Sequence, residues 1–356
     1  MTTLSAAELQ QKIRNGQMID ACNLDGLDLQ GCDLSGGVFQ QVSLNGANLQ
    51  AANLHETVFN ECSLRGATLS GANLRQTVFH DGDLSRLQVG DSLLVQCIFN
   101  QCALGGSDFS RSRCDATQFM QCPLQHSRFS QAQLERTTFF ECELDEAQLE
   151  QCHGLLATFY AIDLRTTCLR QGQFEQTVFF NCDHRGKSYA QQRFSGCQFT
   201  DNRLDEVDFS GAQLTQCNFK GASLRKARLC KVNASQALFM GADLTGAHCQ
   251  DSLFDQALLV GALLRQADFA RSRLFQSVLQ QANAEEARFA GCDLTYSDFT
   301  GARLLRADFR NARFSRSRFH RAQQEGARFT DRRGILDYDE ELLAAEAWSI
   351  QHQSRR

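Results

Sequence analysis

Proline is nearly absent from this chain. One proline, Pro123, occurs in 356 residues, where average usage near 5% would give about 18. Turns and loops favour proline, so we expect few loops between the structural elements. Tryptophan and tyrosine are also scarce, with one and four copies, yet phenylalanine occurs 27 times. This imbalance indicates one structural position that phenylalanine fills repeatedly.

Targeting and membrane signals are missing as well. The first eleven residues, MTTLSAAELQQ, lack a basic stretch followed by an apolar core, so no signal peptide is predicted. No apolar run approaches the length of about 18 residues that a membrane-spanning helix needs. With 42% apolar residues and a net charge of −5, the composition argues against a disordered chain.

A five-residue period governs most of the sequence. From Leu24 to Phe329, the residues whose numbers end in 4 or 9 form one set of 62, of which 29 are Leu and 24 are Phe. A small residue stands two positions earlier, and Asn or Asp often lies between, as in Ala47-Asn48-Leu49. Neither a helix nor a strand has this period. A five-residue period fits a coil whose backbone turns a corner at every unit. Asn and Asp suit these corners because their side chains form hydrogen bonds with the backbone of the turn.

The sequence also has a longer period, which consists of four five-residue units. Along positions 24, 44 and onward to 324, 13 of 16 residues are Leu, and along 39, 59 and onward to 319, 13 of 15 are Phe. The coil therefore repeats every four units. Each coil has four sides, and like residues stack on like residues in neighbouring coils.

The repeat resembles the pentapeptide-repeat family. The resemblance implies an all-β solenoid, a right-handed quadrilateral β-helix of pentapeptide repeats with short N- and C-terminal helices. We expect a capping helix at 1–19, the β-helix at 20–333, and a helix and tail at 334–356. The resemblance says little about function.

The 16 cysteines are interpreted as packing residues. No C-x-x-C occurs, twelve cysteines fall in the small inward position and two in the large one, and only Cys168 and Cys230 point outward. Buried Cys behaves as a small apolar residue, although a metal site or disulfide framework stays an alternative. Abundant free thiols favour a reducing compartment, so we expect a cytoplasmic protein without cofactor or metal.

Both ends of a solenoid need caps. Ser5 and Glu8 form a capping box at the start of a predicted helix that Gly16 ends. A second helix is predicted at 337–352. Its apolar face either caps the last coil or pairs two copies end to end. That face comprises Leu343, Ala347 and Ile350.

Arginine is concentrated near the C-terminus. This segment is interpreted either as a solvated face or as a contact surface for an acidic protein. No aromatic platform accompanies the arginines, which argues against direct nucleic-acid binding. The candidate partner-binding residues are Arg303, Arg306, Arg310, Arg313, Arg316, Arg318 and Arg321.

The pattern weakens before Phe194. Polar residues occupy inward slots, so we predict that residues 183–192 leave the coil as a loop, which is either a recognition element or a tolerated irregularity. The candidate loop residues are Asp183, His184, Arg185, Lys187 and Tyr189.

Three functions are weighed. The first is a non-enzymatic interaction scaffold: the opening helix and the run from Asn23 to Gly31 resemble family members associated with bacterial type VI secretion, which implies an effector or spike component as partner. The second is a DNA-mimicking protein that binds and protects a topoisomerase (gyrase), favoured by an acidic N-terminal part. The third is a translocated effector. No catalytic motif stands out, so no enzymatic activity is expected.

Overall fold

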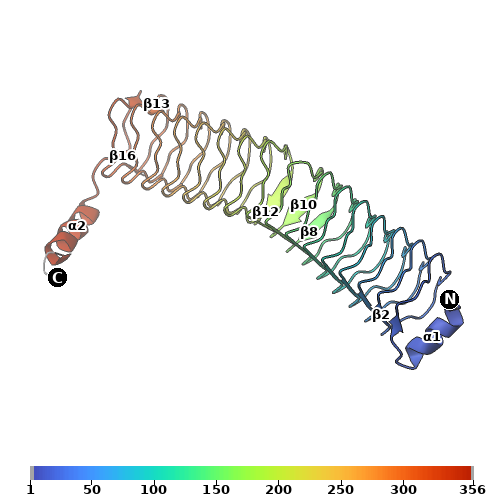
Figure 1. Ribbon diagram of the computed structural model, residues 1–356. Coiled ribbons are helices and arrows are strands. Elements are labelled where there is room, and N and C mark those ends of the chain that lie inside the picture. Colours follow the sequence, from blue (N-terminus) through green and yellow to red (C-terminus); the bar gives the residue numbers. More distant parts are fainter. Residues whose placement is uncertain (1–3, 354–356) are drawn as a thin grey trace. The chain divides into compact units, whose positions relative to one another are not determined.

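The computed structural model describes residues 4–353, and for residues 341 and 350–353 it describes the backbone alone. The chain divides into two compact units, unit 1 at Met1–Asp183 and unit 2 at His184–Arg356. Each unit is a stack of four-sided coils, as Figure 1 shows. Successive coils pair in parallel, each residue with the one four units later in the chain, for example Val38 with Val58. The β-solenoid predicted from the sequence is confirmed.

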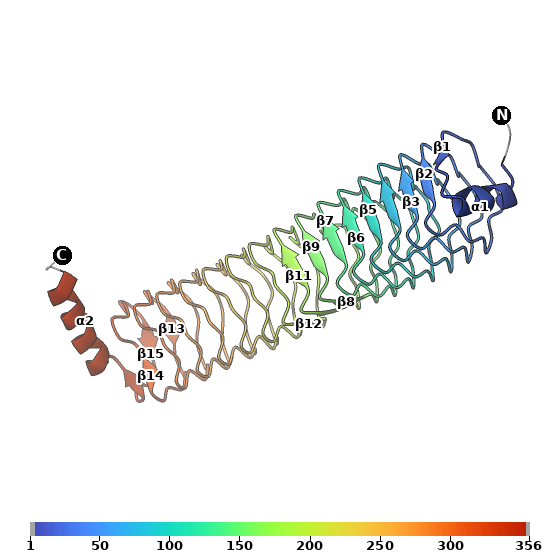
Figure 2. The same cartoon turned by 90° about the horizontal axis from the view of Figure 1, so that it is seen from below.

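The four sides of a coil are named here by their inward residues. Side 1 carries residues 24, 44 and every twentieth residue after; side 2 starts at 29, side 3 at 34 and side 4 at 39. On side 4 of unit 1 the backbone is regular enough to form a nine-stranded parallel sheet, whose strands lie side by side in Figure 2. Its strands are β1 (Ile19–Asp20), β2 (Val38–Gln40), β3 (Val58–Asn60), β4 (Val78–His80), β5 (Ile98–Asn100), β6 (Gln118–Met120), β7 (Thr138–Phe140), β9 (Thr158–Tyr160) and β11 (Val178–Phe180).

The remaining strands are short. Side 3 of unit 1 carries β8 (His153–Leu155) and β10 (Gln173–Glu175), which pair in parallel. Unit 2 contains β12 (Arg193–Ser195), β13 (Asp308–Phe309), β14 (Ser317–Arg318), β15 (Arg328–Phe329) and β16 (Ile335–Leu336). Most other coils of unit 2 are joined by single parallel bridges, such as Asp268 with Arg288. The helices are α1 (Ala6–Arg14) and α2 (Glu340–Gln353).

The large inward residues build the core that the period predicted. Phe119 is fully buried, and its ring stacks on Phe99 and Phe139, each with a centroid distance of 4.9 Å. Small inward Ser, Thr and Cys satisfy carbonyl groups of the preceding coil: the Thr57 hydroxyl donates to the Leu34 carbonyl oxygen at 2.9 Å. Polar groups buried between coils thus retain hydrogen bonds.

Asn and Asp side chains stabilise the corners in the way predicted. The Asn23 side-chain oxygen accepts a hydrogen bond from the Asp25 backbone N–H at 2.8 Å. The residue that follows such a corner commonly adopts positive φ, with glycine at Gly26 (+66°) and a non-glycine residue at Glu56 (+57°). Left-handed backbone costs energy in a non-glycine residue. A hydrogen bond between coils, from the Glu56 N–H to the Arg75 carbonyl at 3.0 Å, holds that conformation.

The N-terminal cap is confirmed. The Ser5 hydroxyl accepts from the Glu8 N–H at 3.3 Å, and the Ser5 N–H donates to the Glu8 carboxylate at 2.9 Å. Leu9 and Ile13 are buried beneath α1. Gly16, at φ +68°, ends the helix because left-handed backbone there lets two N–H groups bond the last turn.

The predicted loop at 183–192 is wrong. Asp183 pairs with Asp163 inside unit 1, and the other nine residues form regular coil in unit 2, where the N–H of Tyr189 donates to the Asp208 carbonyl. His184 and Tyr189 are 0% and 1% exposed. They fit because the His184 Nδ1 lies 2.7 Å from the Tyr189 hydroxyl, so the two polar groups satisfy each other inside the core. Lys187 is only half-buried, which avoids enclosing its charge.

The C-terminal end closes differently from the prediction. The Arg332 guanidinium lies 4.4 Å from the ring centroid of Phe329, which is itself half-buried. In α2, Leu343 is 39% exposed and Ala347 is exposed. The helix contacts the coil through polar groups instead, because Glu346 pairs with Arg321 at 2.5 Å. Capping through the predicted apolar face is therefore wrong for Leu343 and Ala347; the side chain of Ile350 lies outside the described residues.

Candidate functional site

The predicted arginines do not form a single surface. Each five-residue unit forms one side of a coil, and four units complete one turn. Arginines that are close in the sequence are therefore distributed over different sides of the solenoid. Arg303 lies on side 1, Arg313 on side 3 and Arg318 on side 4, as their bridges to the preceding coil show. Arg306 and Arg310 line a common depression. The prediction of one basic contact surface is corrected, because residues that are close in the sequence lie on different sides of the coil.

Several of these arginines are already held by carboxylates. Arg306 pairs with Glu286 and Arg310 with Asp308, each at 2.7 Å. Arg318 lies 3.9 Å from Asp298. Partner binding by this set stays a prediction.

A basic groove lies instead on side 2 of unit 2. It is a shallow depression of about 750 Å³ between neighbouring coils, and we call it the side 2 groove. Five cationic residues and three carboxylates line it, a net charge of +2 with histidine neutral. Its lining residues are Glu206, Lys226, Arg228, Cys230, Lys231, His248, Gln250, Asp251, Asp268, Ala270, Arg271 and Arg288.

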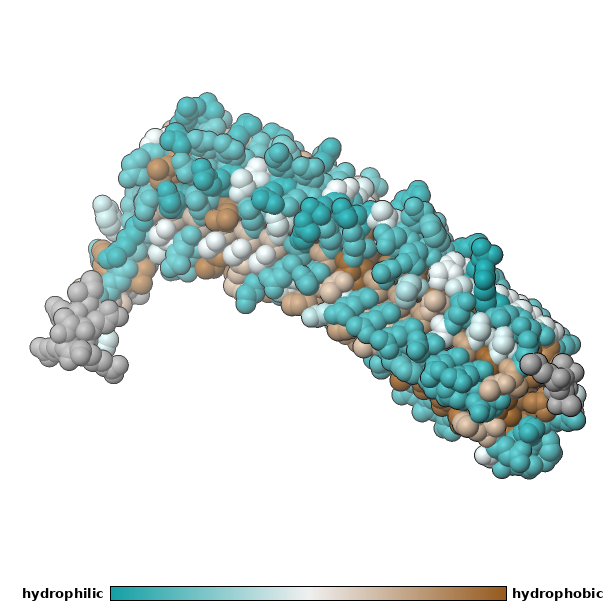
Figure 3. Space-filling model, viewed as in Figure 1, coloured by the Kyte–Doolittle hydropathy of each residue, from teal (hydrophilic) through white to brown (hydrophobic). Residues whose placement is uncertain are grey.

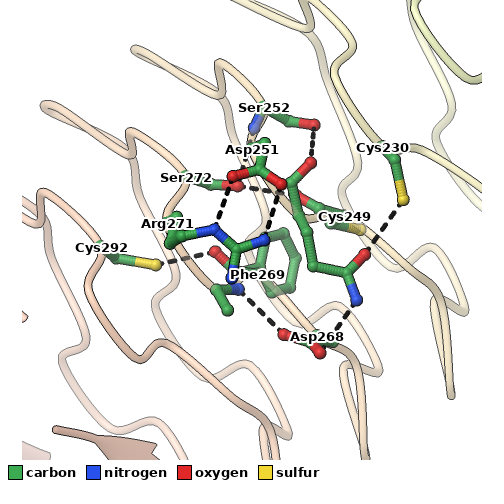
Figure 4. A network of polar contacts seen from close by, with 11 residues as sticks. Cys230, Cys249, Asp251, Ser252, Asp268, Phe269, Arg271, Ser272 and Cys292 are labelled. Carbon is green, nitrogen blue, oxygen red and sulfur yellow. Dashed lines mark hydrogen bonds and ion pairs between the residues drawn. The ribbon is translucent and has the colours of Figure 1, made fainter.

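A network of polar contacts forms one part of the side 2 groove, and Figure 4 shows the Arg271 guanidinium directed at Asp251. The Arg271 guanidinium donates two hydrogen bonds of 2.7 Å to Asp251. These bonds hold the pKa of the Asp251 carboxyl below its usual range and raise the pKa of Arg271. Arg288 donates to Asp268 at 3.0 Å, and Gln250 donates to the same carboxylate at 2.9 Å. Both arginines are thereby paired with carboxylates, while their side chains stay more than half exposed.

In the other part of the side 2 groove, the positive charges are not paired with carboxylates of the described residues. Lys226, Arg228 and Lys231 are exposed, and within residues 4–353 none of them has an ion-pair partner. They line the groove together with Cys230, whose Sγ lies 3.0 Å from the Gln250 side-chain oxygen. The side 2 groove thus combines two arginines paired with carboxylates with three cations that are available to a ligand.

A smaller depression of about 420 Å³ continues on the same side. It shares Arg288 with the side 2 groove and adds Arg306, Arg310 and Arg328. Two of the predicted arginines therefore extend the basic surface found in the structure. Arg313 belongs to a separate depression of about 550 Å³ on side 3.

Two features are absent from the described residues. Within residues 4–353, no group of three or more His, Cys, Asp or Glu side chains is arranged to hold a metal ion. Over the same part of the chain, no helix has the length and apolar character needed to cross a membrane.

Sequence comparison agrees with the coil geometry. The family description "Pentapeptide repeat region" matches residues 20–89. "Pentapeptide repeats (8 copies)" matches residues 117–153, 190–221, 222–259, 267–311 and 292–331. The chain belongs to the pentapeptide-repeat family. No curated protein sequence matches this pentapeptide-repeat protein.

Several solved pentapeptide-repeat structures are similar. QnrB1, a plasmid-mediated fluoroquinolone resistance protein, is 18% identical over 49% of this chain and 90% of its own, with a TM-score of 0.27. HetL, involved in heterocyst differentiation regulation in the cyanobacterium Nostoc, is 18% identical over 80% and 96%, with a TM-score of 0.17. A thylakoid-lumen protein of Arabidopsis thaliana is 34% identical over 30% and 66%, with a TM-score of 0.19.

The sequence did contain a signal for the side 2 groove. Arg228, His248, Asp268 and Arg288 stand four units apart in succession, and Lys226 and Lys231 flank the first of them. Outward residues that are four units apart lie on the same side of the solenoid, so this spacing predicts that these residues share one surface.

Proposed function

We propose that this protein is a non-enzymatic interaction scaffold whose side 2 groove binds an acidic segment of a partner protein. The observation that carries the proposal is the set of three exposed cations, Lys226, Arg228 and Lys231, beside two arginines paired with carboxylates. Guanidinium and ammonium groups bind carboxylates through charge-assisted hydrogen bonds. Arg271 and Arg288 are already paired with aspartates, so the three other cations supply most of the attraction for a carboxylate ligand.

A nucleic acid fits the side 2 groove less well. Asp251 and Asp268 lie among the cations and would face the phosphates of a uniformly charged backbone. The lining also contains no Phe, Tyr or Trp on which bases could stack. A peptide with spaced carboxylates can contact the cations and avoid both aspartates.

More specifically, we propose that the scaffold is an adaptor or accessory protein in bacterial type VI secretion, with an effector or spike component as partner. This role is supported by the resemblance of the opening helix and of residues 23–31 to family members with that association. Affinity capture from the native bacterium, followed by mass spectrometry, tests it. Recovery of secretion components is expected, and their absence from the captured proteins would contradict the adaptor role.

Topoisomerase binding is the alternative function. One observation favours it: unit 1 has 21 acidic and 11 basic residues, a net charge of −10. An acidic surface is what DNA mimicry requires. Inhibition of gyrase supercoiling by the pure protein at stoichiometric concentration would favour this alternative over the adaptor role.

The side 2 groove is tested with a fluorescein-labelled peptide of about ten glutamates and fluorescence anisotropy. The variant Lys226→Glu/Arg228→Glu/Lys231→Glu is expected to weaken binding at least tenfold, because it replaces three attractive contacts by repulsive ones. The matched control is Arg193→Glu/Arg203→Glu/Lys220→Glu, which has the same net charge, uses exposed residues of unit 2 and leaves the side 2 groove intact. Equal weakening in both variants would show that only overall charge attracts the peptide, and would overturn the proposal.

A further inference from the structure

Unit 1 carries a row of aromatic side chains on its outer surface. Phe140, Tyr160 and Phe180 follow the inward residues of β7, β9 and β11 and therefore point outward. Their rings stack at centroid distances of 4.7 Å and 5.6 Å, and all three side chains are half-buried. Figure 2 shows the three strands side by side. We call these three residues the aromatic row.

Some apolar side chains lie near the aromatic row, and Thr138 and Thr158 stand on the same outward face of β7 and β9. Met120 precedes Phe140 in the same register. Leu155 and Leu156, which stand just before β9, are 38% and 45% exposed. By contrast, hydrophilic side chains cover most of the face that Figure 3 shows. An exposed apolar patch with aromatic residues is a feature of protein interfaces.

Carboxylates stand on both edges of this patch. Glu141 directly follows Phe140 on one edge, and Glu175 lies beyond the corner of the coil on the other. Both side chains are exposed. Unit 1 as a whole is acidic, so a second copy of the same face would be repelled. The charge pattern calls for a partner with an apolar centre and basic flanks.

We propose that the aromatic row of unit 1 is a docking surface for an amphipathic helix of a partner protein, with an apolar stripe flanked by Lys or Arg. Helix turns repeat every 5.4 Å, close to the ring spacings of 4.7 Å and 5.6 Å. Anchors at i, i+3 or i+4, and i+7 thus meet successive coils. The stacked rings cover each other's faces and present their edges, against which Leu or Met side chains pack. The basic flanks reach Glu141 and Glu175.

The proposal concerns a different unit and a partner of opposite charge from those of the side 2 groove. A scaffold with both surfaces holds two partners at once, an acidic segment on unit 2 and a basic helix on unit 1. Failure of one binding experiment leaves the other unaffected, because each uses its own probe.

The test uses the full-length protein and a labelled synthetic helix of about five turns, with Leu along one face and Lys on its flanks. The variant Phe140→Ser/Tyr160→Ser/Phe180→Ser is expected to weaken binding at least tenfold. A matched control, Val58→Ser/Val78→Ser/Ile98→Ser, changes the same side of unit 1 outside the aromatic row. It is expected to bind within about twofold of the unmodified protein.

Further variants keep the proposal falsifiable if the aromatic triple variant does not fold. Glu141→Lys/Glu175→Lys leaves the rings intact and is expected to weaken the basic helix while strengthening a helix with Glu in place of Lys. A scrambled peptide of the same composition, without an apolar stripe, is expected to bind at least tenfold more weakly. Equal binding of the scrambled peptide, or binding that none of these variants changes, would overturn the proposal.

Discussion

Replacing Phe119 by Ala is expected to destabilise unit 1 by about 4 kcal/mol. Phe119 is fully buried, its ring is stacked between Phe99 and Phe139, and it contacts the edge of Phe109 at a centroid distance of 5.4 Å. Phe-to-Ala changes in protein cores cost about 3–5 kcal/mol. The lower end of that range does not apply because backbone hydrogen bonds to the coils on both sides limit how far the gap can close.

The assay is urea unfolding followed by circular dichroism, together with hydrogen exchange of the peptides from β5 to β7. Solenoid stability depends on neighbouring repeats, so exchange localises the loss to the coils around residue 119. Phe140→Ala is the matched control. Its ring is outward and half-buried, and about 1 kcal/mol is expected from the lost stacking. Similar losses in the two variants would refute the assignment of inward and outward positions.

Three further predictions concern the ends and the polar core. Ser5→Ala removes the capping box of α1 and is expected to cost about 1 kcal/mol, seen as faster hydrogen exchange in residues 6–14; unchanged exchange would contradict the cap. Tyr189→Phe removes the hydroxyl that contacts His184 and is expected to cost about 1 kcal/mol in urea unfolding, whereas no change would show that this hydrogen bond is dispensable. Pairing of two copies through α2 stays a prediction: it requires the unmodified protein to be a dimer in light scattering and Leu343→Arg, on the exposed side of α2, to be a monomer, and a monomeric unmodified protein would rule it out.

The sequence predicted the repeating fold in detail because each inward position recurs with a fixed spacing. Phe119 and its neighbours in the same column were identified as core residues from that spacing alone. The capping box at Ser5 and Glu8 was equally local, and the structure has it. Such features depend on residues whose separation in the chain fixes their separation in space.

Two predictions were wrong because they depended on which residues become neighbours in space. His184 and Tyr189 looked unsuitable for a core as single residues, yet their mutual hydrogen bond makes both acceptable. The C-terminal arginines were grouped by sequence although the coil distributes them over four sides. The same coil brings Lys226 to the side 2 groove and aligns Phe140 with Phe180. The side 2 groove and the aromatic row can both be predicted from the sequence when outward residues, like inward ones, are compared at a spacing of four units.

Cys230 allows the most direct test of the side 2 groove. Its half-buried thiol lies among Lys226, Arg228 and Lys231. Cys168, the other outward cysteine, is also half-buried and lies in unit 1, so it serves as an internal control. The measurement is the rate of maleimide labelling of each thiol, by mass spectrometry, with and without a saturating glutamate peptide. Slower labelling of Cys230 with unchanged labelling of Cys168 is predicted; equal rates at Cys230 with and without the peptide would contradict binding of acidic segments in the side 2 groove.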